Sequence, residues 1–196
     1  LEKVDKTKYL GVLIDNRLRF NEHGEYIIKK MNKKLGLFRR ISNKLNEENK
    51  ILYYKSIVQP HIDYCSFVFK MMDQKTLNGL QVVQNKCMRV INRENINELR
   101  EKYKIVLVDT RINVNVIKSL NRILIKGKPS ILNNLFVKNI DARVRHMRFA
   151  NNLVIPNYLK NRAQKSFVFV AAREYNLITK FIHDNKLNNN NYINNV

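Results

Sequence analysis

The chain has 196 residues, 44% of them hydrophobic, which is enough to build the core of one domain or of two small ones. Its 37 Lys and Arg residues against 16 Asp and Glu residues give a formal net charge of +21, which favours polyanionic partners, first nucleic acid and then anionic membrane surfaces. No apolar run approaches the roughly eighteen residues that a membrane span needs. The two cysteines, Cys65 and Cys87, lie outside any metal-binding spacing, so we expect no zinc site and read both as reduced core residues of an intracellular protein.

The stretch from residue 9 to residue 20 is rich in β-forming residues. Residues 9–14 are apolar apart from Gly11 and end at Asp15 and Asn16, which favour tight turns. We expect one mostly buried strand with another backbone close to Gly11, followed by a half-exposed strand in which Leu18 and Phe20 alternate with arginines. A plain hairpin or an edge strand is the simpler alternative.

Residues 21–41 have the pattern of an amphipathic helix that Asn21 could cap. An apolar stripe recurs at helical spacing, and cations occupy the opposite side without an interleaved acidic residue: Lys29, Lys30, Lys33, Lys34 and Arg40. A charged row of this kind is usually a solvated face. Because all five positions are positive, contact with nucleic acid is slightly favoured here.

More helices are expected after residue 41. Asn46 and Asp73 are placed as N-caps of two of them, Pro60 should kink or restart the chain, and residues 61–69 suit a short buried helix. The ridge of Gln81, Gln84, Asn85, Lys86 and Arg89 could hold phosphates or could interlock with a neighbouring helix, and the pattern leaves both open.

The second half is less regular. Residues 92–109 lose the helical period, with a short strand or an extended connector at 105–108. Thr110 is expected to cap a helix that Gly127 ends, and a further helix is expected over residues 163–178. Asparagine dominates residues 188–196, which cannot bury enough surface to order themselves.

No catalytic group can be assigned from spacing. The aspartates are isolated, whereas two-metal enzymes need clustered carboxylates. His61 and Cys65 could share a helical face, but no orienting residue can be named, and such a pair is more often part of a core. By itself this chain is expected to perform no chemistry.

Four blocks carry a family resemblance: KYLGVLIDNRLRFNEH, IIKKMNKKLGLFRRI, LYYKSIVQPHIDYCS and LNGLQVVQNKCMRVI. In order and spacing they resemble the region just after the polymerase palm in reverse transcriptases of non-LTR retrotransposons, the jockey-like group in particular. A later stretch, IPNYLKNRAQKSFVFVAAREYN, resembles the distal part of the same reading frame. The resemblance covers about residues 8–176.

The resemblance implies a mainly α fold, with a thumb-type helical bundle that follows a short strand or hairpin and precedes an irregular basic segment. It divides the chain into the end of a palm-type β segment (1–20), a helical thumb-like domain (21–137), a basic C-terminal segment (138–187) and an Asn-rich disordered tail (188–196). Leu10 and Gly11 would lie at the palm–thumb junction, near the hairpin that holds the primer end. The duplex-gripping residues would be Lys29, Lys30, Lys33, Lys34, Arg39, Arg40, Lys86 and Arg89.

The same resemblance implies that this thumb holds RNA or an RNA–DNA hybrid without sequence specificity and works with the palm and fingers of one polyprotein, in the nucleus and cytoplasm and not in a membrane. The family's paired catalytic aspartates precede these blocks and are absent from this chain, so polymerase activity and its Mg²⁺ are expected upstream of Leu1. Gly24 inside the first helix, and a distal block without the family's usual Trp and Pro, depart from the pattern. Two alternatives stay open: a freestanding basic helical nucleic-acid-binding or adaptor module, and a non-functional relic of the element.

Overall fold

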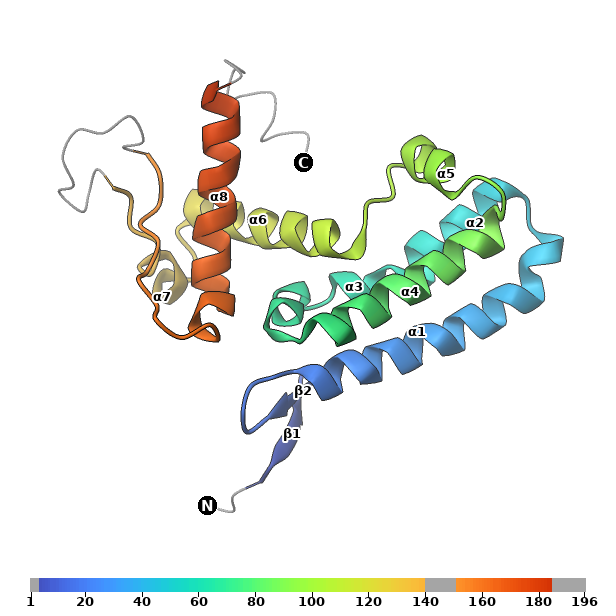
Figure 1. The fold of residues 1–196 in the computed structure, drawn as a ribbon, viewed down its shortest axis with the longest axis horizontal. Coiled ribbons are helices and arrows are strands. Elements are labelled where there is room, and N and C mark those ends of the chain that lie inside the picture. Colours follow the sequence, from blue (N-terminus) through green and yellow to red (C-terminus); the bar gives the residue numbers. More distant parts are fainter. Residues whose placement is uncertain (1–3, 140–150, 185–196) are drawn as a thin grey trace. The chain divides into compact units, whose positions relative to one another are not determined.

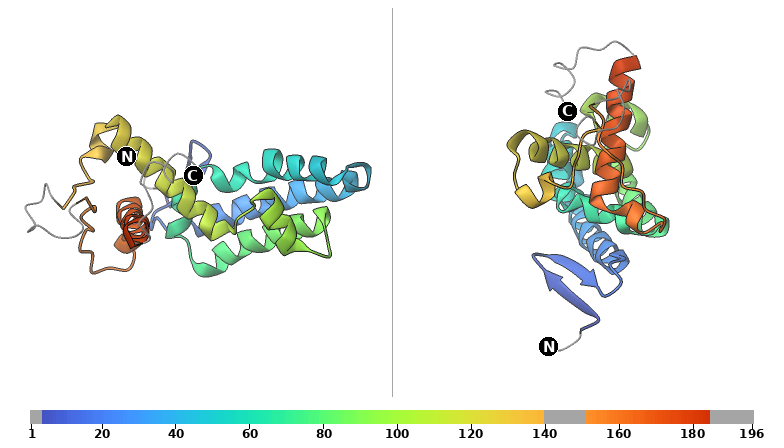
Figure 2. Two further views of the ribbon diagram at one scale, coloured as in Figure 1. Left: turned by 90° about the horizontal axis from the view of Figure 1, so that it is seen from above. Right: turned by 90° about the vertical axis from the view of Figure 1, so that its left-hand side faces the viewer.

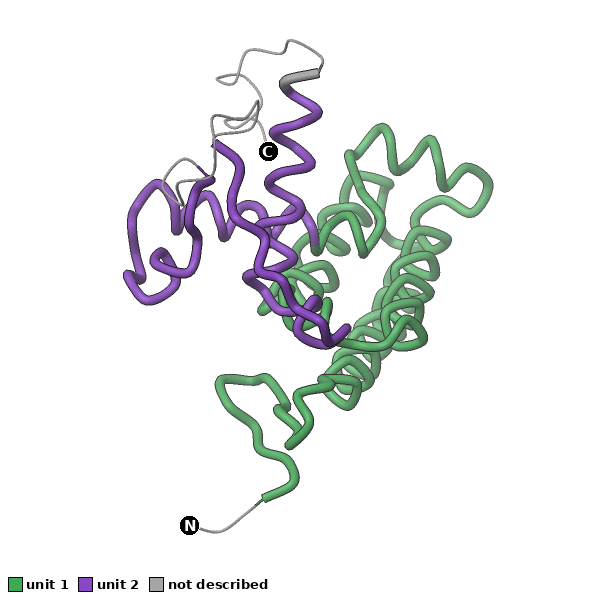
Figure 3. The backbone as a smooth tube through the Cα atoms, turned by 60° about the vertical axis from the view of Figure 1, so that its left-hand side comes forward, with its two compact units in different colours: residues 1–112 green, residues 113–196 purple. Residues whose placement is uncertain are grey.

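The computed structural model describes residues 4–139 and 151–184 and is mainly α-helical, with a β-hairpin at its N-terminal end (Figure 1). The expected fold class is thereby confirmed. The chain forms two compact units, residues 1–112 and 113–196 (Figure 3). The expected divisions after residues 20, 137 and 187 refer to functional parts and stay predictions, and the Asn-rich tail lies outside the described residues.

The hairpin consists of β1 (Lys6–Tyr9) and β2 (Val12–Asp15), which pair antiparallel with Tyr9 opposite Val12. Leu10 and Gly11 between them have φ angles of 46° and 84°, a left-handed pair that reverses the chain in two residues. The expectation of a single buried strand over residues 9–14 is therefore wrong, because the apolar run contains the turn. The simpler alternative of a hairpin is correct.

A loop follows the hairpin, where a second strand was expected. The Asp15 carboxylate accepts hydrogen bonds from the backbone N–H groups of Arg17, Arg19 and Phe20, and these bonds curl the chain back on itself. The alternation of apolar and charged residues over 17–20 was therefore no sign of a strand.

Helices α1 (Asn21–Ile41) and α4 (Gln74–Ile91) form the centre of the first unit and lie side by side in Figures 1 and 2. Two contacts show that they run parallel. Asn21 bonds to Asp73 where both helices begin, and further along both helices the Ile28 side chain lies over Gly79. The buried apolar stripe of α1 was correctly located by its spacing; it comprises Ile27, Met31, Leu35 and Phe38.

Asn21 does not cap α1 as expected. The N-cap position of α1 is Phe20, without a side-chain bond, while the Asn21 carboxamide oxygen accepts the backbone N–H of Asp73 at 2.9 Å. Asn21 thus ties the beginning of α1 to the residue that caps α4. The Asp73 carboxylate accepts the Thr76 N–H at 2.7 Å, so the expected cap of α4 is confirmed.

A compact crossover joins the two parallel helices. Its elements are the 3₁₀ turn η1 (Ser42–Lys44), α2 (Glu47–Tyr53), the π-helical turn η2 (Tyr54–Val58), α3 (Pro60–Asp63) and the 3₁₀ helix η3 (Ser66–Met71). Asn46 caps α2 as expected, accepting the Asn49 N–H at 2.9 Å. Pro60 occupies the first turn of α3, where its missing N–H costs nothing, so the chain restarts there.

After α4 come α5 (Ile96–Tyr103) and α6 (Val108–Lys126). The sequence pattern missed α5 because it is short and strongly charged. Helix α6 begins two residues before the expected cap Thr110, so the apolar run at 105–108 is a connector that enters a helix. Gly127 follows α6 with a φ of 59°, the left-handed stop that was expected.

The second unit includes most of α6, the short α7 (Ser130–Asn133), the 3₁₀ turn η4 (Ala163–Lys165) and α8 (Phe167–Asp184). The Asn176 carboxamide of α8 bonds to both backbone groups of Leu153 at 2.8 Å. Phe136 meets Phe167 edge-to-face at 5.9 Å. The helix expected over residues 163–178 therefore exists, although it starts at Phe167 and continues to Asp184.

Candidate nucleic-acid interface

The exposed side of α1 carries the cations that were selected from the sequence. Lys29, Lys33 and Arg40 fall within a narrow sector of the helix, opposite the buried Met31 and Phe38. All three side chains are exposed, and none forms an ion pair with a carboxylate of residues 4–139 or 151–184. At 1.5 Å rise per residue, Lys29 and Arg40 are separated by about 17 Å along the helix axis. We call these three residues the α1 cation row.

Two further lysines of α1 lie on the flank towards α3. Burial, and then the charges of Lys30 and Lys34, lower the pKa of His61 in α3 below its ordinary value. This electrostatic effect on a half-exposed histidine indicates that both ammonium groups are near α3. Lys30 and Lys34 therefore widen the α1 cation row on one side.

The Tyr26 ring lies beside two ammonium groups, one from α1 and one from β1. The Lys30 ammonium group lies 4.5 Å from the centre of the Tyr26 ring, and Lys8 from β1 lies 5.4 Å from it. Hydrogen bonding to Lys30 and then to Lys8 lowers the pKa of the Tyr26 phenol. Sequence reasoning missed this pair. The spacing from Tyr26 to Lys30 gave a signal, but the contact with Lys8 depends on the hairpin turn, which the pattern did not reveal.

Arg39 of α1 and Lys86 of α4 lie on the flanks where these two helices face each other. Burial raises the pKa of Cys87 in α4 to about 12 while Arg39 opposes that rise, which puts the guanidinium group near α4. Lys86 follows Gly79 by two helical turns, and Gly79 contacts Ile28 of α1, so Lys86 lies along the α1-facing flank of α4.

Arg89 lies on α4, three residues after Lys86. It is exposed on α4, opposite the fully buried Leu80, and is directed away from the core. Six of the eight expected cations therefore lie on α1, and Lys86 and Arg89 lie on α4. Their contact with nucleic acid remains a prediction.

The amide ridge of α4 packs against the rest of the unit. Gln84 is buried and donates to the Tyr54 hydroxyl at 3.0 Å and to the Val106 carbonyl at 3.1 Å. Arg100 of α5 donates to Asn85 at 2.7 Å, and the Val108 N–H donates to Gln81 at 2.8 Å. Of the two open interpretations, interlocking is the one that these bonds support, because the amides hold α5 and the connector after it against α4.

Leu10 and Gly11 form the hairpin turn and offer only backbone groups and an exposed leucine side chain. The Tyr64 hydroxyl donates a hydrogen bond to the Leu10 carbonyl and ties the turn to the segment after α3. Their expected place at the primer end remains a prediction.

No group of three His, Cys, Asp or Glu side chains within residues 4–139 and 151–184 could hold a metal ion. Cys65 has a left-handed φ of 49° outside α3, so it does not share a helical face with His61. Asp63 forms a bidentate pair with Arg111 at 2.7 and 2.8 Å, and that pair links α3 to α6 within the first unit.

Two curated proteins are similar to this chain. One is the RNA-directed DNA polymerase from mobile element jockey of Drosophila funebris, 32% identical over 95 residues. The other is the probable RNA-directed DNA polymerase from transposon X-element of Drosophila melanogaster, 32% identical over 87 residues. The chain is related to the reverse transcriptases of non-LTR retrotransposons.

This relation covers 47% and 43% of the chain but about 10% of the length of each relative. No protein-family model matches the chain, and no solved structure matches it at a significant level. Among the described helices, none is both long enough and apolar enough to cross a bilayer.

Proposed function

We propose that this chain is the thumb and C-terminal part of an RNA-directed DNA polymerase, and that it grips the template–primer duplex through its phosphates. The observation that carries the proposal is the α1 cation row: three exposed cations, paired with no described carboxylate, on one sector of a helix whose opposite side is buried in a core. Such a row supplies affinity for a phosphate backbone without reading its sequence. The similarity to the two retrotransposon polymerases supports the same assignment.

In this proposal the chain contributes binding and no bond-making step. Polymerase chemistry and Mg²⁺ belong to a palm and fingers encoded upstream, with which the hairpin side of the first unit would be continuous. The template would be RNA or an RNA–DNA hybrid. The adaptor alternative shares the binding prediction and differs only in needing no such catalytic partner.

The binding test is a titration of the purified protein with a labelled RNA–DNA hybrid at several salt concentrations. Neutralising Lys29, Lys33 and Arg40 to Gln should remove about three phosphate contacts, and the slope of log K against log salt should then decrease in magnitude by about 2–3.

A matched control neutralises Lys118, Arg122 and Lys126, three exposed cations at helical spacing on α6. Both triple variants lose the same net charge. An equal decrease of the slope in the two variants would mean that the whole field of the protein, and not α1, binds the duplex. Absence of wild-type binding at low salt would refute the proposed function altogether.

The catalytic assignment has a separate test. The reading frame upstream of Leu1 should encode the paired aspartates of a polymerase palm, and co-expression of that segment should give a complex with this chain. An initiator methionine directly before Leu1, with no such frame, would favour the adaptor.

A further inference from the structure

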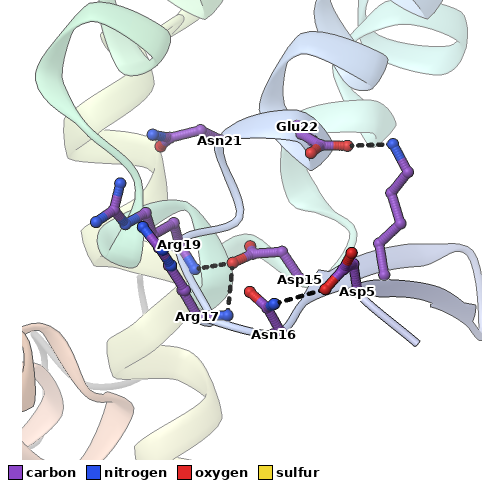
Figure 4. A pocket seen from close by; sticks show the side chains of 8 residues that line it. Asp5, Asp15, Asn16, Arg17, Arg19, Asn21 and Glu22 are labelled. Atoms are coloured by element: carbon purple, nitrogen blue, oxygen red, sulfur yellow. Dashed lines mark hydrogen bonds and ion pairs between the residues drawn. The ribbon is translucent and has the colours of Figure 1, made fainter. Parts of the chain in front are cut away.

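The loop between the hairpin and α1 borders an open hollow of about 600 Å³ (Figure 4). Eight residues line it, and they come from β1 and the residue before it, β2, the loop itself and the first turn of α1: Asp5, Lys6, Asp15, Asn16, Arg17, Arg19, Asn21 and Glu22. Three of these are acidic and three are basic, so composition alone gives the hollow no net sign. The pairing of these charges is what distinguishes them.

The acidic groups already have partners. Asp5 accepts a hydrogen bond from the Asn16 carboxamide at 3.0 Å, and Glu22 pairs with Lys6 at 3.1 Å. Asp15 accepts the N–H groups of Arg17 and Arg19 at 3.0 Å and that of Phe20 at 2.7 Å. Partial burial raises the pKa of Asp15, but these backbone bonds together bring it below its ordinary value. Asp15 is thus an ionised anchor of the loop.

The loop is held in a conformation that it would not adopt freely. Leu18 and Phe20 have φ angles of 52° and 58°, a left-handed region that is unfavourable for residues with a branched or aromatic side chain. Such backbone persists only where its surroundings over-determine it, and here the Asp15 carboxylate does so. The consequence is that the backbone positions of the two arginines on either side of Leu18 are fixed by hydrogen bonds.

Arg17 and Arg19 extend towards the same side of the loop in Figure 4, away from Glu22. Both side chains are exposed, and no described carboxylate forms an ion pair with either of them. Two like charges that line one hollow repel each other, and an anion between them removes that repulsion. The guanidinium fork matches the geometry of a phosphate group.

We propose that Arg17 and Arg19, fixed by Asp15, form a clamp for one phosphate group of a bound nucleic acid. The inference rests on the proposed function and adds to it a contact outside the α1 cation row. Lys29 lies about 12 Å along the helix axis from Asn21, so the clamp and the row hold different phosphates. The phosphate belongs either to the sugar–phosphate backbone or to a phosphorylated strand end, which share the same chemistry.

The test compares wild type with R17Q/R19Q in titrations with an RNA–DNA hybrid. Loss of two contacts should decrease the magnitude of the salt slope by about 2, so that the advantage of wild type shrinks about tenfold between 50 and 200 mM salt. K118Q/R122Q removes the same charge from α6 and should leave the slope closer to that of wild type. Equal binding by R17Q/R19Q and wild type would overturn the clamp.

The substitution Asp15→Asn distinguishes binding by two arginines that Asp15 holds in place from attraction by the net positive charge of the protein. This substitution makes the protein more positive by one charge, so a field alone would tighten binding. The clamp instead predicts weaker binding, because the arginines lose their anchor. Tighter binding by D15N would overturn the inference. Since D15N could disturb the hairpin itself, R17K/R19K provides a second test: it keeps both charges and the loop, and it should weaken binding because an ammonium group lacks the fork.

Hybrids with a 5′-phosphate and with a 5′-hydroxyl identify the source of the phosphate. A stronger effect of R17Q/R19Q on the phosphorylated strand assigns the clamp to a strand end, and equal effects assign it to the backbone. The two proposals can fail separately. Loss of binding in the α1 triple variant with unchanged binding in R17Q/R19Q rejects the clamp alone, whereas no wild-type binding rejects the proposed function.

Discussion

The two glycines inside α1 should respond in opposite ways to the same substitution. In Gly24→Ala the new Cβ would lie 2.3 Å from Thr76 Cγ2 and 2.7 Å from Met72 Sδ, closer than carbon and sulfur atoms can approach. Thr76 is buried and β-branched, so its packed side chain has little freedom to turn aside. Gly36 has no atom within 4 Å of its Cβ position and is exposed.

The magnitudes follow from two terms. Alanine stabilises a helix interior by about 1 kcal/mol relative to glycine, and forcing a methyl group into a packed contact costs about 1–3 kcal/mol. Gly36→Ala should therefore raise the free energy of unfolding by about 1 kcal/mol. Gly24→Ala should lower it by up to about 2 kcal/mol, because the steric cost exceeds the gain in propensity.

Urea unfolding followed by helical circular dichroism measures both changes on the same protein. The comparison is internal, because both sites belong to one helix and receive the same methyl group. If Gly24→Ala stabilised the protein as much as Gly36→Ala, the close parallel packing of α1 on α4 would be refuted.

Three other outcomes are expected. Burial, and then the charge of Lys30, lower the pKa of His23 below 6.5, so the unfolded chain binds the proton more readily and the free energy of unfolding should fall as the pH drops below 6.5. His23→Gln should reduce that fall in urea titrations above and below this pH. An unchanged fall would exclude His23 as its cause. Gln84→Leu leaves the buried Tyr54 hydroxyl without its partner and should cost about 2 kcal/mol of unfolding free energy, so a neutral result would contradict the buried network. Gly11→Ala should cost about 1 kcal/mol because φ is 84°, while Gly11→Asn, which tolerates this conformation, should cost less; equal costs would speak against the turn.

The local chemistry of single elements could be predicted from the sequence. The caps Asn46 and Asp73, the stop at Gly127 and the apolar stripe of α1 each depend on residues within a few positions of one another. The hairpin was misjudged because the left-handed pair at Leu10 and Gly11 interrupts an apolar run that resembles one strand.

Other features depend on residues that are distant in the sequence. Asn21 bonds across 52 residues to Asp73, so its role as a tie between helices could not be deduced from its place before α1. Gly24 looked unfavourable inside a helix because the residue that requires a glycine there, Thr76, lies 52 positions later in the sequence.

The candidate interface divides in the same way. The cations of α1 were found because one helix brings them together. Arg89 belongs to a different helix, so its place relative to the cations of α1 depends on how α4 packs against α1. Alternation suggested that Arg17 and Arg19 lie on the exposed face of a strand, and the loop that Asp15 holds was not predicted.

The parallel course of α1 and α4 has a consequence for how the chain acquires its structure. Two antiparallel helices can pair across a short turn. Here residues 42–73 must first return the chain from the end of α1 to its beginning before α4 can pack against α1. Closing that long loop delays the pairing, so the first unit should fold more slowly than a simple helical hairpin of its size. A nascent chain that has emerged only as far as Met72 would still expose the apolar stripe of α1, and that interval is when the protein is most open to aggregation.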